Sequence, residues 1–197
     1  MGDDRHPPVP AAGQPPGQPP RFSPPTSHVR LSFIAAMEEF RGEGRGSATD
    51  DTMLGREIRD YGLDWQDPER FGAYASYLRD QARADAPRRP GYVPSTTLWW
   101  VDGDEFLGRL AIRHRLTPRL TDLGGHIGYD VKPSARRRGH ATAMLAAALP
   151  LACGLGIDPA LVTCDESNGG SRRVIEANGG RLEDKRGSEL RFWVPTS

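Results

Sequence analysis

The segment from Asp130 to Thr142 holds the residue types that bind a phosphate group. Pro133 ends a strand, and Gly139 lets a ligand approach the backbone closely. The helix expected from His140 begins with unpaired N–H groups and with the positive end of its dipole. Together these features predict an anion site suited to a phosphate or a pyrophosphate. A solvated turn with basic side chains is the alternative that this segment alone leaves open.

Three consecutive arginines, Arg136, Arg137 and Arg138, add positive charge at the rim of the same turn. The segment lacks the Gly-Lys-Ser/Thr of a P-loop and the Gly-x-Gly-x-x-Gly of a dinucleotide-binding turn, which disfavours ATP and NAD. The 26 Lys and Arg residues are balanced by 26 Asp and Glu residues. A nucleic-acid-binding domain usually carries a clear positive excess, so we expect no nucleic-acid partner.

The composition of the 197 residues, 37% hydrophobic and 26% charged, is typical of a globular protein with one well-buried domain. No apolar run approaches the roughly 18 residues that span a bilayer, so no membrane partner is expected. The N-terminus lacks the apolar region of a secretory signal, which predicts a cytoplasmic protein with two reduced cysteines. The five histidines are scattered, and no metal site is expected.

Two regions differ sharply in composition. Residues 1–28 hold nine of the 18 prolines and predict a disordered tail, whereas residues 29–197 are expected to form a single domain. The apolar spacing of the domain predicts helices first, then a hairpin, then alternating strands and helices, which together indicate a mixed α/β fold. The expected helices cover residues 31–42, 51–60, 67–83, 141–152 and 171–178. The expected strands cover residues 96–101, 105–113, 125–131, 160–164, 181–184 and 189–194, with loops at 85–94 and 117–122.

The order of motifs resembles the GNAT (GCN5-related N-acetyltransferase) superfamily. Arg136-x-x-Gly139-x-Ala141, after a strand that ends Ile127-Gly128-Tyr129-Asp130-Val131, is similar to motif A of that family. Asn168-x-x-Ser171, opening a helix that ends in Asn178-Gly179-Gly180, is similar to motif B. The resemblance covers residues 98–194, and the segments 113–116 and 124–129 are similar to a bacterial subgroup.

This resemblance implies a GNAT-like α/β fold (an α+β mixed sheet) with a splayed central sheet and flanking helices. It implies an N-acetyltransferase that moves an acetyl group from acetyl-CoA to a primary amine by direct attack in a ternary complex. The acceptor is not identified, and a homodimer is compatible with the sequence. The implied cofactor-binding residues are Tyr129, Val131, Arg136, Arg137, Arg138, Gly139, His140, Ala141, Thr142, Asn168 and Ser171.

Two positions depart from the family's pattern. His126 stands where many members carry a glutamate base, and a histidine pKa of about 6.5 suits a base near neutral pH; the alternative is an inert, hydrogen-bonded histidine. Ile175 stands where a tyrosine of the family often donates a proton to the leaving thiolate. Tyr129, Ser171 or a water could serve instead, or the thiolate leaves without a donor. The missing tyrosine keeps a second interpretation open, a non-catalytic acyl-CoA-binding or regulatory domain.

Two further features have a structural and a functional interpretation. Cys164 ends a strand that faces the expected gap; a structural cysteine is the default, and a nucleophilic role is the alternative. Arg113, His114 and Arg115 follow one another on a strand, where the trio could bind an acidic group of the substrate or form an exposed edge.

Overall fold

Seven strands form two antiparallel sheets in residues 19–197, the part of the chain that the computed structural model describes. The first sheet has the order β1-β2-β3-β4 and the second the order β5-β7-β6. The strands are β1 (Arg21–Ser23), β2 (Ser95–Asp102), β3 (Glu105–Arg113), β4 (Ile127–Val131), β5 (Ala160–Asp165), β6 (Arg181–Arg186) and β7 (Glu189–Val194).

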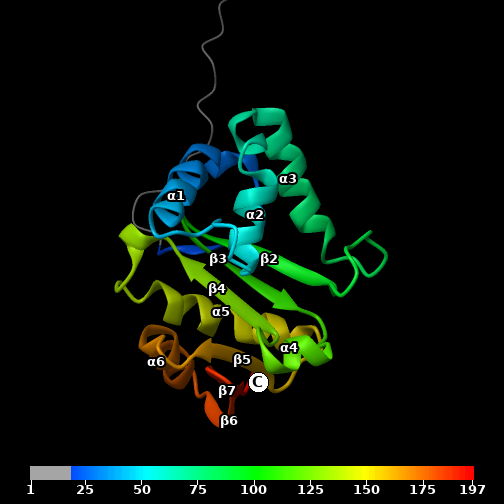
Figure 1. Cartoon of the computed structure of the whole chain (residues 1–197), viewed down its shortest axis with the longest axis vertical. Coiled ribbons are helices and arrows are strands. Elements are labelled where there is room, and N and C mark those ends of the chain that lie inside the picture. The colour runs from blue at the N-terminus through cyan, green and yellow to red at the C-terminus, as the bar shows by residue number, and fades with distance from the viewer. Residues whose placement is uncertain (1–18) are drawn as a thin grey trace, which may run out of the picture.

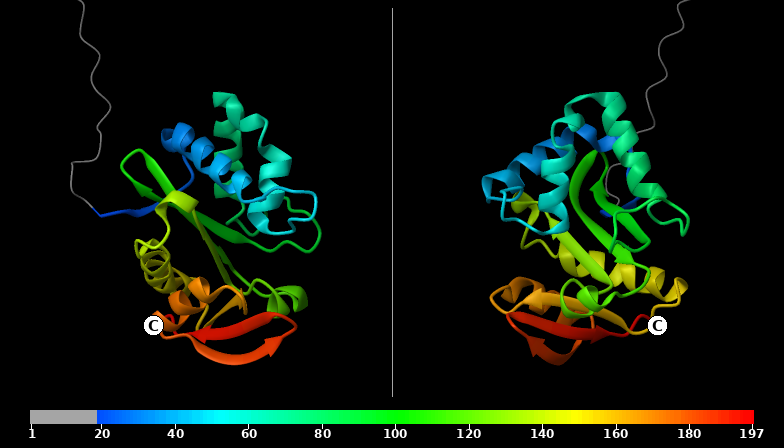
Figure 2. Two further views of the ribbon diagram at one scale, coloured as in Figure 1. Left: turned by 60° about the vertical axis from the view of Figure 1, so that its left-hand side comes forward. Right: turned by 45° about the vertical axis from the view of Figure 1, so that its right-hand side comes forward.

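The helices cover both faces of the first sheet. In Figure 1 and Figure 2, α1, α2 and α3 lie on one face of it, and α5 lies on the other face, toward the second sheet. The α-helices are α1 (Arg30–Gly42), α2 (Met53–Tyr61), α3 (Pro68–Asp80), α4 (Pro118–Asp122), α5 (His140–Gly154) and α6 (Gly169–Ala177), and the 3-10 helices are η1 (Ser27–Val29), η2 (Asp64–Gln66) and η3 (Pro133–Ala135).

Local sequence signals explain most of these boundaries. The carboxylate of Asp67 accepts hydrogen bonds from the N–H groups of Glu69 and Arg70, and Pro68 occupies the first position of α3, as predicted. Gly103 supplies the positive φ, 54°, that the tight turn between β2 and β3 requires. The predicted hairpin and the predicted helix α3 are therefore confirmed.

Two hydrophobic cores lie on opposite faces of the first sheet. One joins α1, α2 and α3 to aromatic residues of the sheet, where Phe33 stacks on Trp99 with ring centroids 5.0 Å apart. The other joins α5 to both sheets through residues such as Leu110, Leu145 and Val162, all of them almost fully buried. Because α5 packs against both sheets, this second core fixes the place where they meet.

The two sheets meet at one end of β4 and β5 and diverge toward the other, as Figure 2 shows. At the closed end, the N–H of His126 donates to the carbonyl of Leu161 at 2.7 Å. Gly125 is required there, because a β-carbon on it would lie 2.4 Å from the same carbonyl oxygen. Beyond this junction the edge of β4 has no ladder partner among the described residues. The predicted splayed sheet and the mixed α/β fold are confirmed.

Two predicted boundaries were wrong. Ordered structure begins before residue 29, because β1 pairs with β2 through the register Phe22–Trp100; the rest of the predicted tail, residues 1–18, lies outside the described residues. Residues 117–122, predicted as a loop, contain α4, whose first turn is capped by the hydroxyl of Thr117.

Candidate active site

The turn between η3 and α5 presents backbone N–H groups without partners. Gly139 adopts a left-handed conformation with φ 82°, and a β-carbon on it would meet no atom within 4 Å, so open space adjoins the backbone. Among the described residues, no acceptor takes the N–H groups of four consecutive residues at the start of α5, namely Gly139, His140, Ala141 and Thr142. This is the geometry of an anion site at a helix N-terminus.

The arginine side chains of the turn behave differently from one another. Arg136 donates two hydrogen bonds of 2.7 Å to the carboxylate of Glu43 after α1, and its Nε donates to the carbonyl of Val131 at 3.0 Å. Its guanidinium therefore docks α1 against the turn, which argues against the predicted contact of this side chain with a ligand. Arg137 and Arg138 are exposed and make no ion pair with the described residues, so they remain candidates for the rim.

The side chain of His140 is half-buried and contacts Trp100. Its Nδ1 accepts a hydrogen bond from the indole N–H of Trp100 at 3.4 Å. The predicted ligand contact of His140 can thus come only from its backbone N–H or from the remaining ring nitrogen.

The open edge of β4 adjoins this turn. The backbone N–H of Arg113 in β3 donates to the carbonyl of His126 at 2.7 Å. Because hydrogen-bonded pairs alternate along an antiparallel ladder, the backbone groups of the even-numbered residues of β4 bond to β3. The N–H and C=O groups of the odd-numbered residues then point toward β5, namely those of Ile127, Tyr129 and Val131. The predicted pantetheine-binding amides, at Tyr129 and Val131, are therefore on the edge that has no ladder partner.

Three polar side chains gather where β4 faces β5 and α6. The hydroxyls of Tyr129 and Ser171 lie 2.8 Å apart, and Cys164 is close to both. Burial raises the pKa of Tyr129 to about 12, although the hydrogen bond with Ser171 opposes the shift. Burial likewise raises the pKa of the Cys164 thiol, and the negative charge of Glu189 adds to that effect. At neutral pH both groups therefore carry their protons.

Asn168 opens α6 as its N-cap. Its Oδ1 accepts a hydrogen bond from the N–H of Ser171 at 3.0 Å. One side of this amide is thereby committed to the helix, and its NH₂ group remains for the predicted pantetheine contact.

His126 is held in place by two hydrogen bonds with one residue. Besides the backbone bond described above, its Nδ1 accepts the N–H of Leu161 at 2.9 Å. A neutral imidazole whose Nδ1 accepts must carry its proton on Nε2, so it has no lone pair left to take a proton from a substrate. Burial and the nearby charge of Arg113 both lower the pKa of His126. This geometry argues against the predicted base role and favours a role in closing the junction between β4 and β5.

The opposite face of β4 carries a charged group that the sequence motifs did not single out. Asp130 is half-buried beneath the connection between α1 and α2, where its Oδ1 lies 3.4 Å from Nη2 of Arg45. Burial raises the pKa of Asp130, and the charges of Arg45 and Arg109 oppose the shift. The two-residue alternation along the strand predicts that Gly128 and Asp130 share this face, opposite Tyr129 and Val131.

The predicted trio does not lie on one strand, because β3 ends at Arg113 and His114 and Arg115 follow it. His114 forms a hydrogen bond of 2.9 Å with the hydroxyl of Thr96, Arg115 is exposed, and Arg113 reaches back over Gly128. Arg113 is therefore the member of the trio that belongs to the face of Asp130.

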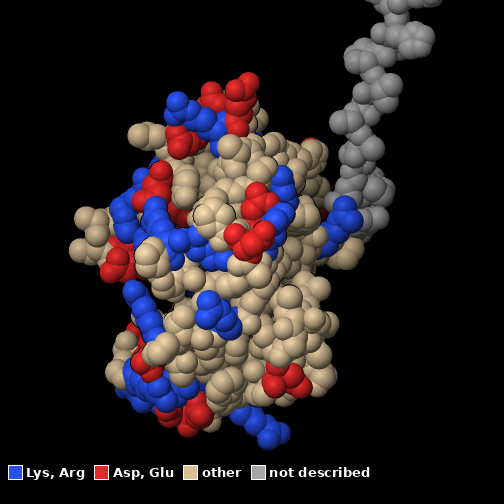
Figure 3. Space-filling view, turned by 90° about the vertical axis from the view of Figure 1, so that its right-hand side faces the viewer, with Lys and Arg blue, Asp and Glu red and all other residues tan. Residues whose placement is uncertain are grey.

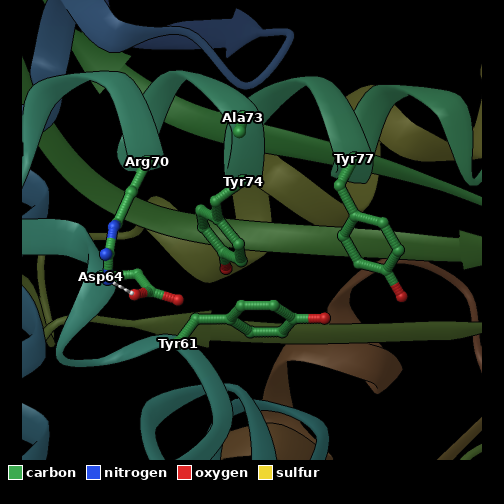
Figure 4. A pocket seen from close by; sticks show the side chains of 6 residues that line it. All are labelled: Tyr61, Asp64, Arg70, Ala73, Tyr74 and Tyr77. Carbon is green, nitrogen blue, oxygen red and sulfur yellow. Dashed lines mark hydrogen bonds and ion pairs between the residues drawn. The ribbon is translucent and has the colours of Figure 1, made fainter.

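Outside the candidate site, a hollow opens between α2, η2 and α3 (Figure 4). The rings of Tyr61 and Tyr74 lie 5.2 Å apart and those of Tyr61 and Tyr77 5.8 Å apart, while Asp64 pairs with Arg70 at 2.7 Å. Its aromatic and charged groups thus contact one another, and none of them is a predicted site residue.

Charged side chains of both signs lie on the surface of residues 19–197. Acidic and basic groups are interspersed on the face in Figure 3. Within this part of the chain, no three His, Cys, Asp or Glu side chains are grouped so that they could hold a metal ion. None of its helices combines the length and the hydropathy that a membrane crossing requires.

A splayed sheet with unpartnered amides beside its open strand edge is the arrangement that the resemblance to acyl-CoA-dependent acetyltransferases implies. The model of the acetyltransferase (GNAT) domain family matches residues 52–181, about two thirds of the chain. The chain therefore belongs to this family and is an acetyl-CoA-dependent acetyltransferase. Comparison with curated proteins gives no match.

Solved structures share the fold at low sequence identity. RimJ from Mycobacterium smegmatis, in complex with CoA-disulfide, is 18% identical with a TM-score of 0.59, covering 88% of this chain and 80% of RimJ. The ribosomal-protein-S5-alanine acetyltransferase from Vibrio fischeri is 10% identical with a TM-score of 0.60, and the match covers 93% of this chain and 95% of that protein. The PaiA N-acetyltransferase from Thermoplasma acidophilum, in complex with coenzyme A, is 14% identical with a TM-score of 0.54, covering 90% and 99%.

Proposed function

We propose that this protein transfers the acetyl group of acetyl-CoA to a primary amine by direct attack within a ternary complex. The neutral amine nitrogen attacks the thioester carbonyl carbon, the new C–N bond forms, and the C–S bond breaks. The amine loses one proton, and the departing thiolate gains one, so the products are an acetamide and CoA.

One observation carries this proposal: unpartnered backbone amides occur both at the start of α5 and along the open edge of β4. The amides of Gly139 through Thr142 would hold the pyrophosphate, and those of Tyr129 and Val131 would bind the pantetheine and polarise the carbonyl. The exposed guanidinium groups of Arg137 and Arg138 would add charge at the rim. Two structures with this fold are complexes with CoA or its disulfide, which supports the same ligand here.

Tyr129 is the best candidate for the proton donor. Its raised pKa keeps the hydroxyl protonated at neutral pH, and the hydroxyl of Ser171 orients it toward the gap between β4 and β5. This replaces the tyrosine that the family often carries at the position of Ile175. The raised pKa of Cys164 keeps that thiol protonated, which favours direct attack over an acetyl-cysteine intermediate.

The proposed reaction is tested by thiol release from acetyl-CoA across a panel of primary amines, with the acetamide identified by mass. Amine-dependent release with a matching acetamide supports the proposal. Tight CoA binding without turnover of any amine would instead favour the non-catalytic acyl-CoA-binding domain.

The role of Tyr129 is tested with Tyr129→Phe. Loss of a proton donor should lower kcat about 100-fold and leave the affinity for CoA unchanged. Tyr77→Phe, in the hollow between α2 and α3 and outside the candidate site, is the matched control and should keep full activity. An unchanged kcat in Tyr129→Phe would exclude Tyr129 as the donor.

A further inference from the structure

The face of the first sheet beneath α2 carries several arginines. Some of them have a carboxylate in contact, and others do not. Arg109 is fully buried and paired with Glu57 of α2, with Nη2 and Oε1 3.1 Å apart. Arg45 is paired with Asp130 at 3.4 Å and lies 3.8 Å from Asp50. Each of these guanidinium groups therefore has a carboxylate in contact.

Arg113 shares this face with Arg109 but has no carboxylate in contact among the described residues. Its Nη1 donates to the carbonyls of Gly124 at 2.8 Å and Gly125 at 3.2 Å, and no described acceptor takes its Nη2 or Nε. Burial lowers the pKa of Arg113 to about 10, and the charge of Arg109 contributes, although the charge of Asp130 opposes the shift. A largely buried charge with no carboxylate in contact is costly, and such groups usually have a partner.

Arg56 of α2 adds a second unpaired guanidinium. It makes no ion pair with the described residues, its Nη1 donates to the carbonyl of Asp51, and its buried Nε has no acceptor in this part of the chain. Its charge is near enough to Arg113 to lower the pKa of that residue further. The face therefore holds more guanidinium groups than carboxylates. The guanidinium groups belong to Arg45, Arg56, Arg109 and Arg113, and the carboxylates to Asp50, Glu57 and Asp130.

The position of Arg113 relates this charge to the reaction. A β-carbon on Gly128 would lie 3.5 Å from both Nη1 and Nη2 of Arg113, so the guanidinium covers the strand where a side chain is missing. The next residue is Tyr129, whose N–H is on the open edge of β4. The guanidinium thus lies one residue along the strand from the amide that would polarise the thioester.

We propose that the acceptor is a small amine that also carries an anionic group, a carboxylate or a phosphate, and that Arg113 binds this group with Arg56 adding to the positive field. The inference rests on the proposed acetyl transfer and specifies its substrate class. An amine on a protein chain, with no anion near the nitrogen, would leave the guanidinium of Arg113 without an anion in contact.

The test compares acceptors in matched pairs. Free amino acids are compared with their amides, and phosphoethanolamine with ethanolamine, by thiol release and by the mass of the acetamide. In the wild type, kcat/KM should be at least tenfold higher for the anionic acceptor than for its neutral partner in one of the two kinds of pair. A preference for amino acids over their amides would show that a carboxylate is bound, and a preference for phosphoethanolamine over ethanolamine would show that a phosphate is bound. Equal use of both members in every pair would overturn the inference.

Variants separate binding of the anion from a structural role. Arg113→Gln should remove the preference by lowering kcat/KM for the anionic acceptor at least tenfold, with little change for its neutral counterpart. Arg113→Lys should retain part of the preference for the anionic acceptor. Arg115→Gln, at an exposed neighbouring residue, should retain the whole preference. An equal loss for both members in Arg113→Gln, with acetyl-CoA still bound, would mean that Arg113 only holds the carbonyls of Gly124 and Gly125.

A second measurement does not depend on turnover. N-acetyl amino acids and their amides, which are the acetylated products, are titrated into the CoA-bound protein by calorimetry. The wild type should bind the anionic product more tightly than the neutral amide, and Arg113→Gln should show no preference. If no amine is acetylated, the proposed function fails, and this binding difference still decides the inference. Absence of any anionic preference in binding would overturn it.

Discussion

The left-handed glycine at the start of α5 allows the effect of a substitution on folding to be separated from its effect on binding. In Gly139→Ala, φ 82° places an alanine in a conformation that costs roughly 1–2 kcal/mol for a residue with a β-carbon. The new methyl group meets no atom within 4 Å, so no clash adds to this cost. For a chain of this size, the melting temperature should fall by about 2–8 °C.

The same methyl group enters the space that the pyrophosphate would occupy. We expect the Kd for CoA to rise at least about tenfold, which corresponds to roughly 1.4 kcal/mol. Gly156→Ala is the matched control, because Gly156 lies just beyond the other end of α5 with φ 78° and equally open surroundings. It should lose the same stability and keep the wild-type Kd. Titration calorimetry and thermal melts measure both quantities, and equal Kd values in the two variants would refute the anion site at Gly139.

Two further predictions concern the framework of the site. His126→Ala removes the acceptor of the Leu161 N–H and should cost about 1–3 kcal/mol of unfolding free energy. His126→Asn places an amide oxygen where Nδ1 accepts, so it should keep most of the stability and the kcat. Loss of kcat in a stable Asn variant would instead support the role of His126 as the base. The pKa of His126 is lower in the folded protein than in the unfolded chain, so the unfolded chain binds a proton first as the pH falls. The free energy of unfolding should therefore decrease as the pH drops below about 6.5, and it should decrease less in His126→Asn. Arg109→Leu leaves the half-buried carboxylate of Glu57 without its ion-pair partner and should cost about 3–5 kcal/mol of unfolding free energy, measured by urea unfolding. A smaller loss in the double variant Arg109→Leu, Glu57→Leu would support the pairing, and an equal loss would speak against it.

Local signals predicted the elements that depend on neighbouring residues. The Asp67-Pro68 start of α3 and the Gly103 turn were correct because a cap or a tight turn needs only a few residues to form. The same reasoning was available for Thr117-Pro118, where α4 was missed because the helix has only five residues and buries none of them. Strand β1 was missed because three residues among prolines carry no detectable alternation.

The parts of the site that the sequence did not predict depend on contacts between distant residues. Arg136 stands in the motif but turns to Glu43, 93 residues earlier in the chain. The tautomer of His126 depends on Leu161, 35 residues later, and no spacing rule predicts which ring nitrogen such a contact will use. The motif therefore indicated the candidate anion-binding turn, whereas the contacts of individual side chains could be described only from the fold.

Amide hydrogen exchange with and without saturating CoA tests the central claim most directly, since it reports on the backbone N–H groups themselves and needs no acceptor. Exchange should slow at least about tenfold in residues 137–142 and 127–131 and stay the same in the β6–β7 turn. Bound CoA that leaves the exchange of residues 137–142 unchanged would contradict the assignment of this turn as the pyrophosphate site.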